Sequence, residues 1–239
     1  MIRKAQGRKD KGKVRLDRIS DGDQACGFAW TWCTENEEGL RGTTYVELNK
    51  VREIAFVREI PEPLFKPGDL TAKLLEAVTK GAEPKIVEYE KKTPTKANEI
   101  AKYLFNEVQG ASVDEGMRFF GDDIIYRDFN FENPLFGKDE VRKFIEDFNF
   151  PGITFKIQRI DDGVLSTSFC WEVVLEGIKE TTRGISLYEL NPETKLISYV
   201  RDVPEGTMKP PPLGNLARQL RPGLGYFSGV KVGSRKGGR

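Results

Sequence analysis

The stretch VRLDRISDGDQACGFAWTW at residues 14–32 decides the fold, because a similar stretch returns later in the chain. Residues 155–173 read FKIQRIDDGVLSTSFCWEV, and the match aligns Trp30 with Trp171. Self-similarity at a fixed spacing is a signature of repeated structural units. We therefore expect two copies of one sheet-forming unit.

The match continues through two further segments. Residues 40–49, LRGTTYVELN, align with residues 182–191, TRGISLYELN, and VREIPEPLFKP aligns with VRDVPEGTMKP, each after a one-residue shift. Both shifts fall in predicted turns, where an insertion does not turn strand side chains to the other face. Each unit is predicted to form four antiparallel strands and a short helix, with the helical residues Leu70, Leu74, Leu75 and Val78 in the first and Leu213, Leu216 and Leu220 in the second.

The segment between the two units predicts a linker and then helices. Residues 80–96 are charged and contain prolines, as linkers do. Thr95 is the predicted cap of a first helix, and Ser112 with Glu115 forms a capping box for a second. Two short strands follow, and residues 137–148 carry apolar side chains at the spacing of one helix face.

Two helices, a short hairpin, a third helix and a four-stranded meander is the order found in the nuclear transport factor 2-like and SnoaL-like families. Residues 96–222 resemble it throughout, and FFGDDIIYRDFNFENPLFGKDEVRKFI is similar to the family pattern of a strand ending in a carboxylate, a Pro-containing hairpin, a Gly and a helix. The resemblance implies an α+β, cone-shaped, cystatin-like fold, in which a curved antiparallel sheet and three helices enclose a pocket.

Within these families the segment YVRDVPEGTMKP is most similar to plastid-associated plant and algal members. The resemblance implies the plastid stroma, and a cytoplasmic location is the alternative. Cys26, Cys33 and Cys170 form no CxxC pair and lie in apolar runs, which is typical of a reducing compartment.

The first unit departs from the family because it has no preceding helices. We expect a partial repeat at residues 1–80, a linker at 81–95, a complete domain at 96–222 and a basic, Gly-rich tail at 223–239. The apolar face of the first sheet is expected to be covered by the second domain, by a sister subunit or by an upstream segment. Whether the N-terminus is native or truncated stays open.

Composition excludes several function classes. Lys and Arg number 38 against 37 Asp and Glu, so nucleic-acid binding is not expected except through the basic tail. No run of 18 apolar residues predicts a membrane span. The absence of histidine excludes His-containing triads and metal sites, and no phosphate-binding or zinc motif occurs, so no cofactor and no metal are expected.

The resemblance implies chemistry by carboxylates with Tyr and Arg, either proton abstraction or water activation. Asp128 is the best catalytic candidate, with help from Tyr126 and Arg201. The interpretations without chemistry are a hairpin-capping role for Asp128 and a sheet role for Arg201, whose counterpart Arg58 lies in the incomplete unit. The candidate ligand-pocket residues are Tyr103, Phe120, Trp171 and Tyr188, and the candidate interface residues are Phe129 and Phe131.

Strand alternation limits which of these side chains can meet. Tyr126 and Asp128 share one face of their strand. Arg201 and Asp202 are adjacent, so they point to opposite faces and do not form a dyad. Trp171 has a core interpretation, because Trp30 stands at the aligned position.

The favoured function is that of a non-catalytic binding or scaffold protein, which would be a subunit or accessory factor of a larger assembly. The resemblance implies that this assembly lies in a plastid. Its protein partner or sister subunit would cover the first sheet. The alternatives are a small-molecule isomerase, cyclase or hydrolase of SnoaL-like type, and a carrier of an apolar small molecule bound in the second domain. The pattern of residues leans away from an enzyme without excluding one.

Overall fold

A computed structural model describes residues 12–63, 65–83, 87–175 and 182–205 of the chain. These described residues belong to one compact unit by their contacts. The predicted helix around Leu216 and the predicted tail at 223–239 lie outside the described residues. Within the described ranges, no helix is long and apolar enough to cross a membrane.

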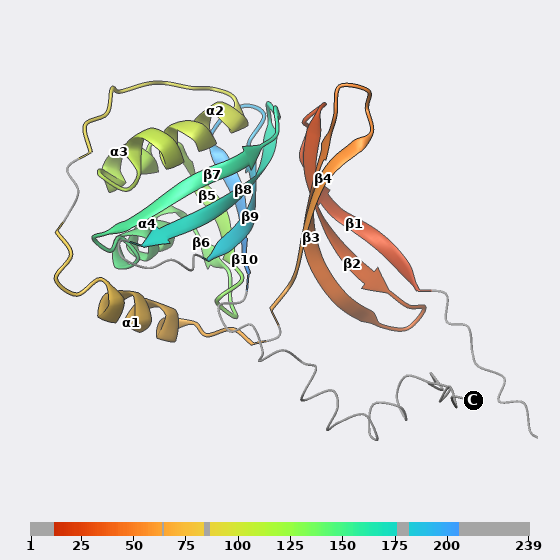
Figure 1. The fold of residues 1–239 in the computed structure, drawn as a ribbon, viewed down its shortest axis with the longest axis horizontal. Coiled ribbons are helices and arrows are strands. Elements are labelled where there is room, and N and C mark those ends of the chain that lie inside the picture. Colours follow the sequence, from red (N-terminus) through yellow and green to blue (C-terminus); the bar gives the residue numbers. More distant parts are fainter. Residues whose placement is uncertain (1–11, 64, 84–86, 176–181, 206–239) are drawn as a thin grey trace, which may run out of the picture. The chain divides into compact units, whose positions relative to one another are not determined.

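The first sheet is an antiparallel meander, which we call the first meander. It contains β1 (Lys13–Ile19), β2 (Ala25–Cys33), β3 (Glu38–Leu48) and β4 (Ile54–Pro61), in that spatial order (Figure 1). The side chain of Asn49 holds the last turn, because its Oδ1 accepts hydrogen bonds from the N–H groups of Val51 at 3.0 Å and Glu53 at 2.9 Å. Helix α1 (Asp69–Val78) follows, as predicted.

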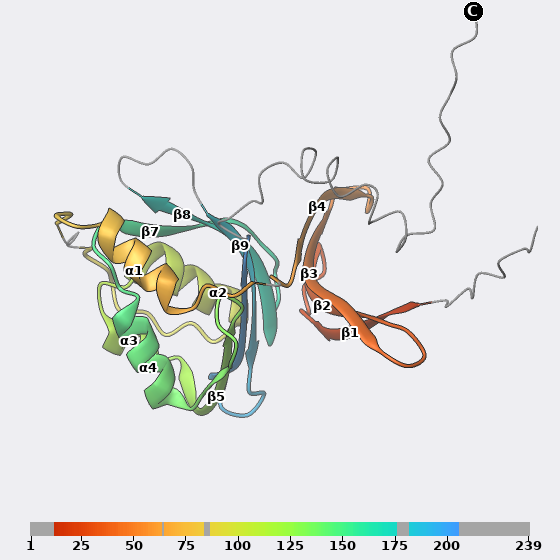
Figure 2. The same cartoon turned by 90° about the horizontal axis from the view of Figure 1, so that it is seen from below.

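The second sheet has six strands in the order β6-β5-β10-β9-β8-β7. The helices lie on one side of this sheet in Figures 1 and 2. The helices and strands follow one another along the chain in the predicted order. The elements are α2 (Ala97–Lys102), the π-helix η1 (Tyr103–Val108), α3 (Val113–Met117), β5 (Phe120–Asp128), β6 (Leu135–Phe136), α4 (Lys138–Asp147), β7 (Ile153–Ile160), β8 (Ser166–Leu175), β9 (Arg183–Leu190) and β10 (Ile197–Pro204). The predicted α+β fold with three helical segments and a sheet is confirmed.

The local signals for the helices are only partly realised. Ser112 caps α3 as predicted, because its Oγ accepts from the N–H of Glu115 at 3.1 Å. The prediction that Thr95 caps α2 is wrong: the N-cap is Lys96, and no side chain caps it. The first turn is held by tertiary contact instead, since the N–H of Ala97 donates to the carbonyl of Val164 at 2.8 Å.

Strands β7 to β10 form a second meander whose pairing repeats that of the first. Trp30 lies opposite Gly42, and Trp171 lies opposite Gly184. Strand pairing also shifts at aligned places, between Leu16 and Arg18 in one meander and between Ile157 and Arg159 in the other. The aligned positions of the sequence therefore occupy the same places in the two meanders.

The two meanders pack through their inner faces, which share a buried apolar cluster. The cluster consists of Ala25, Tyr45, Ile60, Phe129, Cys170, Ile185 and Val203. At one end of this contact, Asp21 accepts hydrogen bonds from the N–H groups of residues 164–166 at 2.8 to 3.1 Å. The aligned Asp162 accepts in return from the N–H groups of Asp23 at 2.8 Å and Gln24 at 3.4 Å.

Ion pairs cross the same contact in the same reciprocal way. Arg18 pairs with Glu189 and lies 3.6 Å from the ring centre of Tyr199. Arg159 pairs with Glu47 at 2.6 Å and lies 4.1 Å from the ring centre of Phe56. The residues of the first ion pair and its ring align one by one with those of the second in the sequence match. The contact between the meanders is therefore approximately two-fold symmetric.

One face of the first meander is covered within the described chain, which was one of the three covers expected. The second meander covers the first on the face of Thr31, Thr43 and Tyr45, each of which is 0% exposed. The opposite face, which carries Trp30 and Trp32, is not the covered one: Trp32 is 42% exposed. Both faces are rich in apolar side chains, so alternation alone cannot say which is buried.

Candidate functional site

Asp202 on β10 is the centre of a buried polar chain beneath the helices. One carboxylate oxygen accepts a hydrogen bond from the hydroxyl of Ser186, and the other accepts from the hydroxyl of Tyr126. Ser186 Oγ in turn accepts from the indole N–H of Trp171 at 2.7 Å. Strands β5, β8, β9 and β10 each contribute one of these four side chains.

Burial changes the acidity of two neighbouring carboxyl groups. Removal from water raises the pKa of Asp202 to about 6, although the two hydroxyl donors oppose the rise. Asp128 is the register partner of Asp202 across β5 and β10, and burial followed by repulsion from Asp202 raises the pKa of Asp128 to about 7. Carboxyl groups that titrate near neutral pH are suited to general acid or base work.

Asp128 also has the hairpin role considered above. Its Oδ1 accepts from the N–H of Asn130 at 2.7 Å, which holds the turn after β5. The recess beside it has essentially no room for a water molecule and is lined by Lys66, Arg127, Phe129, Phe131, Glu132, Asn133 and Pro134. Ligand pockets usually measure about 300 to 1,000 Å³, so this recess is too small for most ligands.

The structure does not bring Arg201 to this site. Its Nε donates to Thr43 Oγ1 of the first meander at 2.8 Å, and its guanidinium lies 4.0 Å from the ring centre of Phe129. Alternation correctly placed Arg201 and Asp202 on opposite faces of β10. The choice of Arg201 as the pocket residue needs correction, because the face of Arg201 packs on the first meander and the face of Asp202 lies under the helices.

The four candidate pocket residues lie in the buried core between the six-stranded sheet and its helices. Tyr103, Phe120, Trp171 and Tyr188 are 2%, 3%, 7% and 4% exposed. Phe105 fills the space between the sheet and the helices, with its ring centre 4.9 Å from that of Phe169 and 6.3 Å from that of Tyr188. The hydroxyl of Tyr103 donates to Glu115 at 2.9 Å. These rings therefore pack mainly on one another.

The two candidate interface residues point to different places. Phe129 is 3% exposed and belongs to the cluster between the meanders. Phe131 packs on α4, with its ring centre 5.4 Å from that of Phe144 and 5.6 Å from that of Phe148. Neither side chain forms an exposed docking patch.

The sequence analysis missed Asp202 as the centre of the site, although a signal for it was present. In the first meander, Trp30 Nε1 donates to Thr44 Oγ1 at 3.0 Å, and Thr44 Oγ1 donates to Glu59 at 3.2 Å. These three residues align with Trp171, Ser186 and Asp202. Aromatic, hydroxyl and carboxylate side chains at aligned places indicate a common polar chain, which holds neighbouring strands together in both meanders.

A larger hollow of about 440 Å³ opens beside the contact between the meanders. It is lined by Gln24, Ala25, Glu47, Leu48, Lys102, Gln158, Arg159, Ile160, Asp161 and Asp162. Its carboxylates already have partners: Glu47 pairs with Arg159, and Asp161 accepts from Ser20 at 2.5 Å and Thr167 at 2.6 Å. Across the described ranges, no three His, Cys, Asp or Glu side chains are grouped to hold a metal ion.

The outer face of the first meander carries exposed apolar side chains. We define it by the strand positions on the side of Trp30, which are Val14, Leu16, Ile19, Cys26, Phe28, Trp30, Trp32, Gly42, Thr44, Val46, Leu48, Ile54, Val57, Glu59 and Pro61. Glu59 is the single charged residue among them. Leu16 is 57% exposed and Val57 is 53% exposed.

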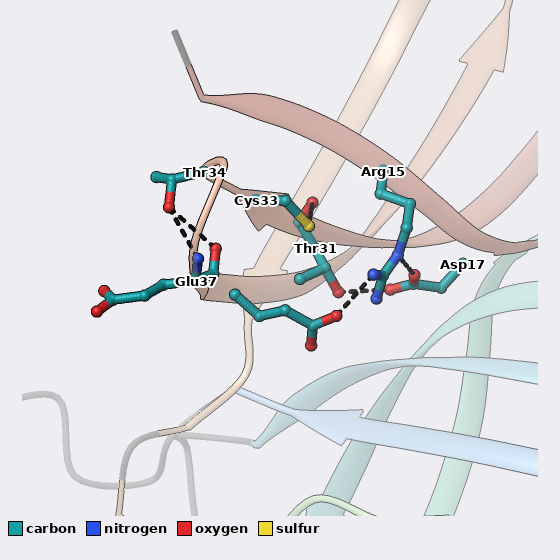
Figure 3. Close-up of polar contacts among 7 residues, drawn as sticks. Arg15, Asp17, Thr31, Cys33, Thr34 and Glu37 are labelled. Carbon is teal, nitrogen blue, oxygen red and sulfur yellow. Dashed lines mark hydrogen bonds and ion pairs between the residues drawn. The ribbon is translucent and has the colours of Figure 1, made fainter. Parts of the chain in front are cut away.

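Charged side chains of the first meander gather on its other side. Arg15 donates to Asp17 at 2.7 Å and to Glu38 at 2.6 Å, and Asp17 also accepts from the hydroxyl of Thr31 at 2.5 Å (Figure 3). Large contiguous apolar surfaces are rare on monomeric proteins and usually mark interaction sites. The outer face therefore combines exposure with an almost uncharged surface.

Comparison with known proteins gives matches to solved structures only. No family model matches the chain, and no curated protein matches it. A provisionally named ketosteroid isomerase from Kribbella flavida is 20% identical, with a TM-score of 0.41 over 48% of this chain and 82% of that one. An LEH-like epoxide hydrolase from Mycobacterium tuberculosis is 18% identical, with a TM-score of 0.37 over 46% of this chain and 81% of that one.

A nuclear transport factor 2-like protein of unknown function from Cytophaga hutchinsonii is 9% identical, with a TM-score of 0.39 over 48% of this chain and 94% of that one. The similar structures are nuclear transport factor 2-like and SnoaL-like proteins. The match covers about half of this chain. At these identities and TM-scores it carries no activity over to this protein.

Proposed function

We propose that this protein is a non-catalytic binding or scaffold protein, built from two copies of one sheet-forming unit, that presents the outer face of its first meander to a protein partner. The observation that carries the proposal is the contrast between aligned residues. Val57 on the outer face is 53% exposed, whereas Val200 at the aligned place in the second meander is fully buried under the helices. Covering a half-exposed side chain of this size stabilises a complex by about 1 kcal/mol.

The test uses two matched leucines. Leu16 on the outer face and Leu74 on α1 are both 57% exposed, so a glutamate at either place is accommodated in water. In extracts of its source cells, the chain is expected to run in a complex larger than its own mass. Leu16→Glu should return it to the mass of the free chain, and Leu74→Glu should not.

Native mass measurement on the two variants reads the result. A Leu16→Glu chain that keeps the large mass would contradict the proposal. The plastid setting and the role as a complex subunit are sequence-based predictions, and the same extracts test them by fractionation of organelles.

A second candidate function is that of a small-molecule enzyme, and one observation favours it. Asp128 and Asp202 are adjacent carboxyl groups with pKa values raised to about 7 and about 6, next to the hydroxyl of Tyr126. The filled interior around Phe105 and the small recess at Asp128 favour the binding role instead. The same filled interior counts against a carrier of an apolar ligand.

Substitution of Asp128 separates the two candidates. If the protein is an enzyme that uses this carboxylate, Asp128→Asn should lower turnover by at least a hundredfold, because an amide cannot exchange a proton near pH 7. The unfolding midpoint should not fall, since asparagine keeps an oxygen for the N–H of Asn130 and carries no buried charge. Turnover of an isomerase and hydrolase substrate panel, measured beside thermal unfolding, checks both points. Equal loss of activity and stability would assign Asp128 to structure alone.

A further inference from the structure

The edge of the first meander differs from the aligned edge of the second. In the order β1-β2-β3-β4, β4 is an edge strand. Its aligned strand β10 is an inner strand, because β5 pairs with it in parallel and places Tyr126 beside Val200 and Asp128 beside Asp202. An edge strand offers a row of backbone N–H and C=O groups to which another strand can be added.

The single charge on the outer face lies beside this edge. Glu59 is exposed on β4 and accepts a hydrogen bond from Thr44, as Asp202 accepts from Ser186. Asp202 receives a second donor, the hydroxyl of Tyr126 on β5. The described part of the chain brings no strand of this kind to β4, and no described residue takes the place of the Tyr126 hydroxyl at Glu59.

The helices of the second domain indicate what else belongs on this surface. Strand β5 leads through β6 into α4, whose Val141 is fully buried in the same core as Val200 and Trp171. The aligned outer face has apolar side chains and no described helix over them. A partner that covers the outer face would therefore present an apolar helix face to it and a strand to the edge of β4.

We infer that the partner of the outer face is a separate polypeptide that adds a strand parallel to β4, donates a hydrogen bond to the Glu59 carboxylate and lays an amphipathic helix over Trp30. This inference rests on the proposed function and names the chemistry of its partner. The donor is a tyrosine hydroxyl or a lysine ammonium, because Glu59 brings the only negative charge to an otherwise uncharged surface. A carboxylate in that place would be repelled.

A second copy of this chain is a poorer occupant of the same edge. Two copies related by a two-fold axis would bring identical β4 strands together side by side, and such edge-to-edge pairs run antiparallel. The parallel arrangement that β5 makes with β10 requires a different strand. The geometry therefore favours a heterologous partner.

The experiment uses as a probe a peptide with the sequence of the strand and helix that cover the second meander. A labelled peptide of residues 119–149, which contains β5, β6 and α4, is added to the full chain, and binding is followed by fluorescence anisotropy. We expect saturable binding and slower hydrogen exchange at the amides of Val57 to Glu59. A Tyr126→Phe peptide, or a Glu59→Gln chain, should bind about tenfold more weakly, because each removes a hydrogen bond that involves a charged group.

Controls separate this inference from the proposed function. Leu74→Glu should leave peptide binding unchanged, and Leu16→Glu should abolish it. Acrylamide quenching of Trp32 in the free chain reports whether the outer face is open. An open face without protection of β4 amides, or an unchanged affinity of Glu59→Gln, overturns the inference and leaves the proposed function standing. A shielded Trp32 overturns both, and protection of β4 in a homodimer replaces the partner by a second copy.

Discussion

Gly27→Ala is expected to lower the free energy of unfolding by about 3 kcal/mol, at the upper end of the range for overpacking of a close contact. The two meanders approach closely at this residue. A Cβ atom at Gly27 would lie 1.9 Å from Ser168 Oγ and 2.2 Å from Ser168 Cβ, so one backbone must move. Chemical denaturation, followed by tryptophan fluorescence, measures the loss.

Positions 27 and 168 are aligned in the two meanders, so a compensating change is available. Ser168→Gly removes the clashing atoms and should restore most of the stability of Gly27→Ala, less the hydrogen bond that Ser168 donates to the carbonyl of Ser186 at 2.8 Å. Gly116→Ala is the control, because its nearest contact would be 3.9 Å away at Leu104. Additive losses in the double variant would contradict the proposed contact.

The buried carboxyl groups are expected to make the protein less stable as pH rises. The folded-state pKa of Asp202 is about 6 against an ordinary value of 3.8, so the folded state binds this proton more tightly than the unfolded state does. Its contribution is complete below about pH 4 and is lost as pH rises through 6. Asp128, with a pKa of about 7, acts in the same direction.

The expected loss from Asp202 between pH 4 and pH 8 is on the order of 3 kcal/mol, since each unit of pKa shift corresponds to about 1.4 kcal/mol, and Asp128 adds to it. Asp202→Asn should remove the Asp202 contribution, because the amide stays neutral at every pH, and should reduce that of Asp128 by removing the repulsion between them. Asp122→Asn changes an exposed carboxylate on the strand of Asp128 and should keep the wild-type profile. Urea denaturation at five pH values measures the free energy of unfolding of each variant. A wild-type profile in Asp202→Asn would assign the dependence to other groups.

Sequence alone was sufficient for the order of the elements, because the internal match shows the strands twice. Residues 14–32 and 155–173 differ in many side chains yet share their turn and tryptophan, so both stretches could be divided into strands. The start of α2 could not be predicted in the same way. Thr95 has the right chemistry for a cap, but the contact of Ala97 with Val164 holds that turn, and such a contact is formed only after folding.

The candidate site was half predictable. Alternation correctly separated Arg201 from Asp202, but it could not show which of them lies under the helices. Arg201 was expected to assist Asp128 because the resemblance implies chemistry by carboxylates with Tyr and Arg, and a buried arginine elsewhere is unusual. The structure buries its guanidinium instead against Phe129 and Thr43, which are distant in sequence. Only the packing of one meander on the other makes that place suitable for a charge.

The reciprocal contact between the meanders joins two parts of a single polypeptide. Asp21 and Asp162 hold one another's turns as two subunits might, yet the chain between them supplies the connection. Tethering makes such a contact intramolecular, with an effective concentration set by the length and stiffness of the connection. Dilution therefore does not separate the meanders, and the unfolding midpoint should stay constant from nanomolar to micromolar protein, unlike that of an obligate dimer.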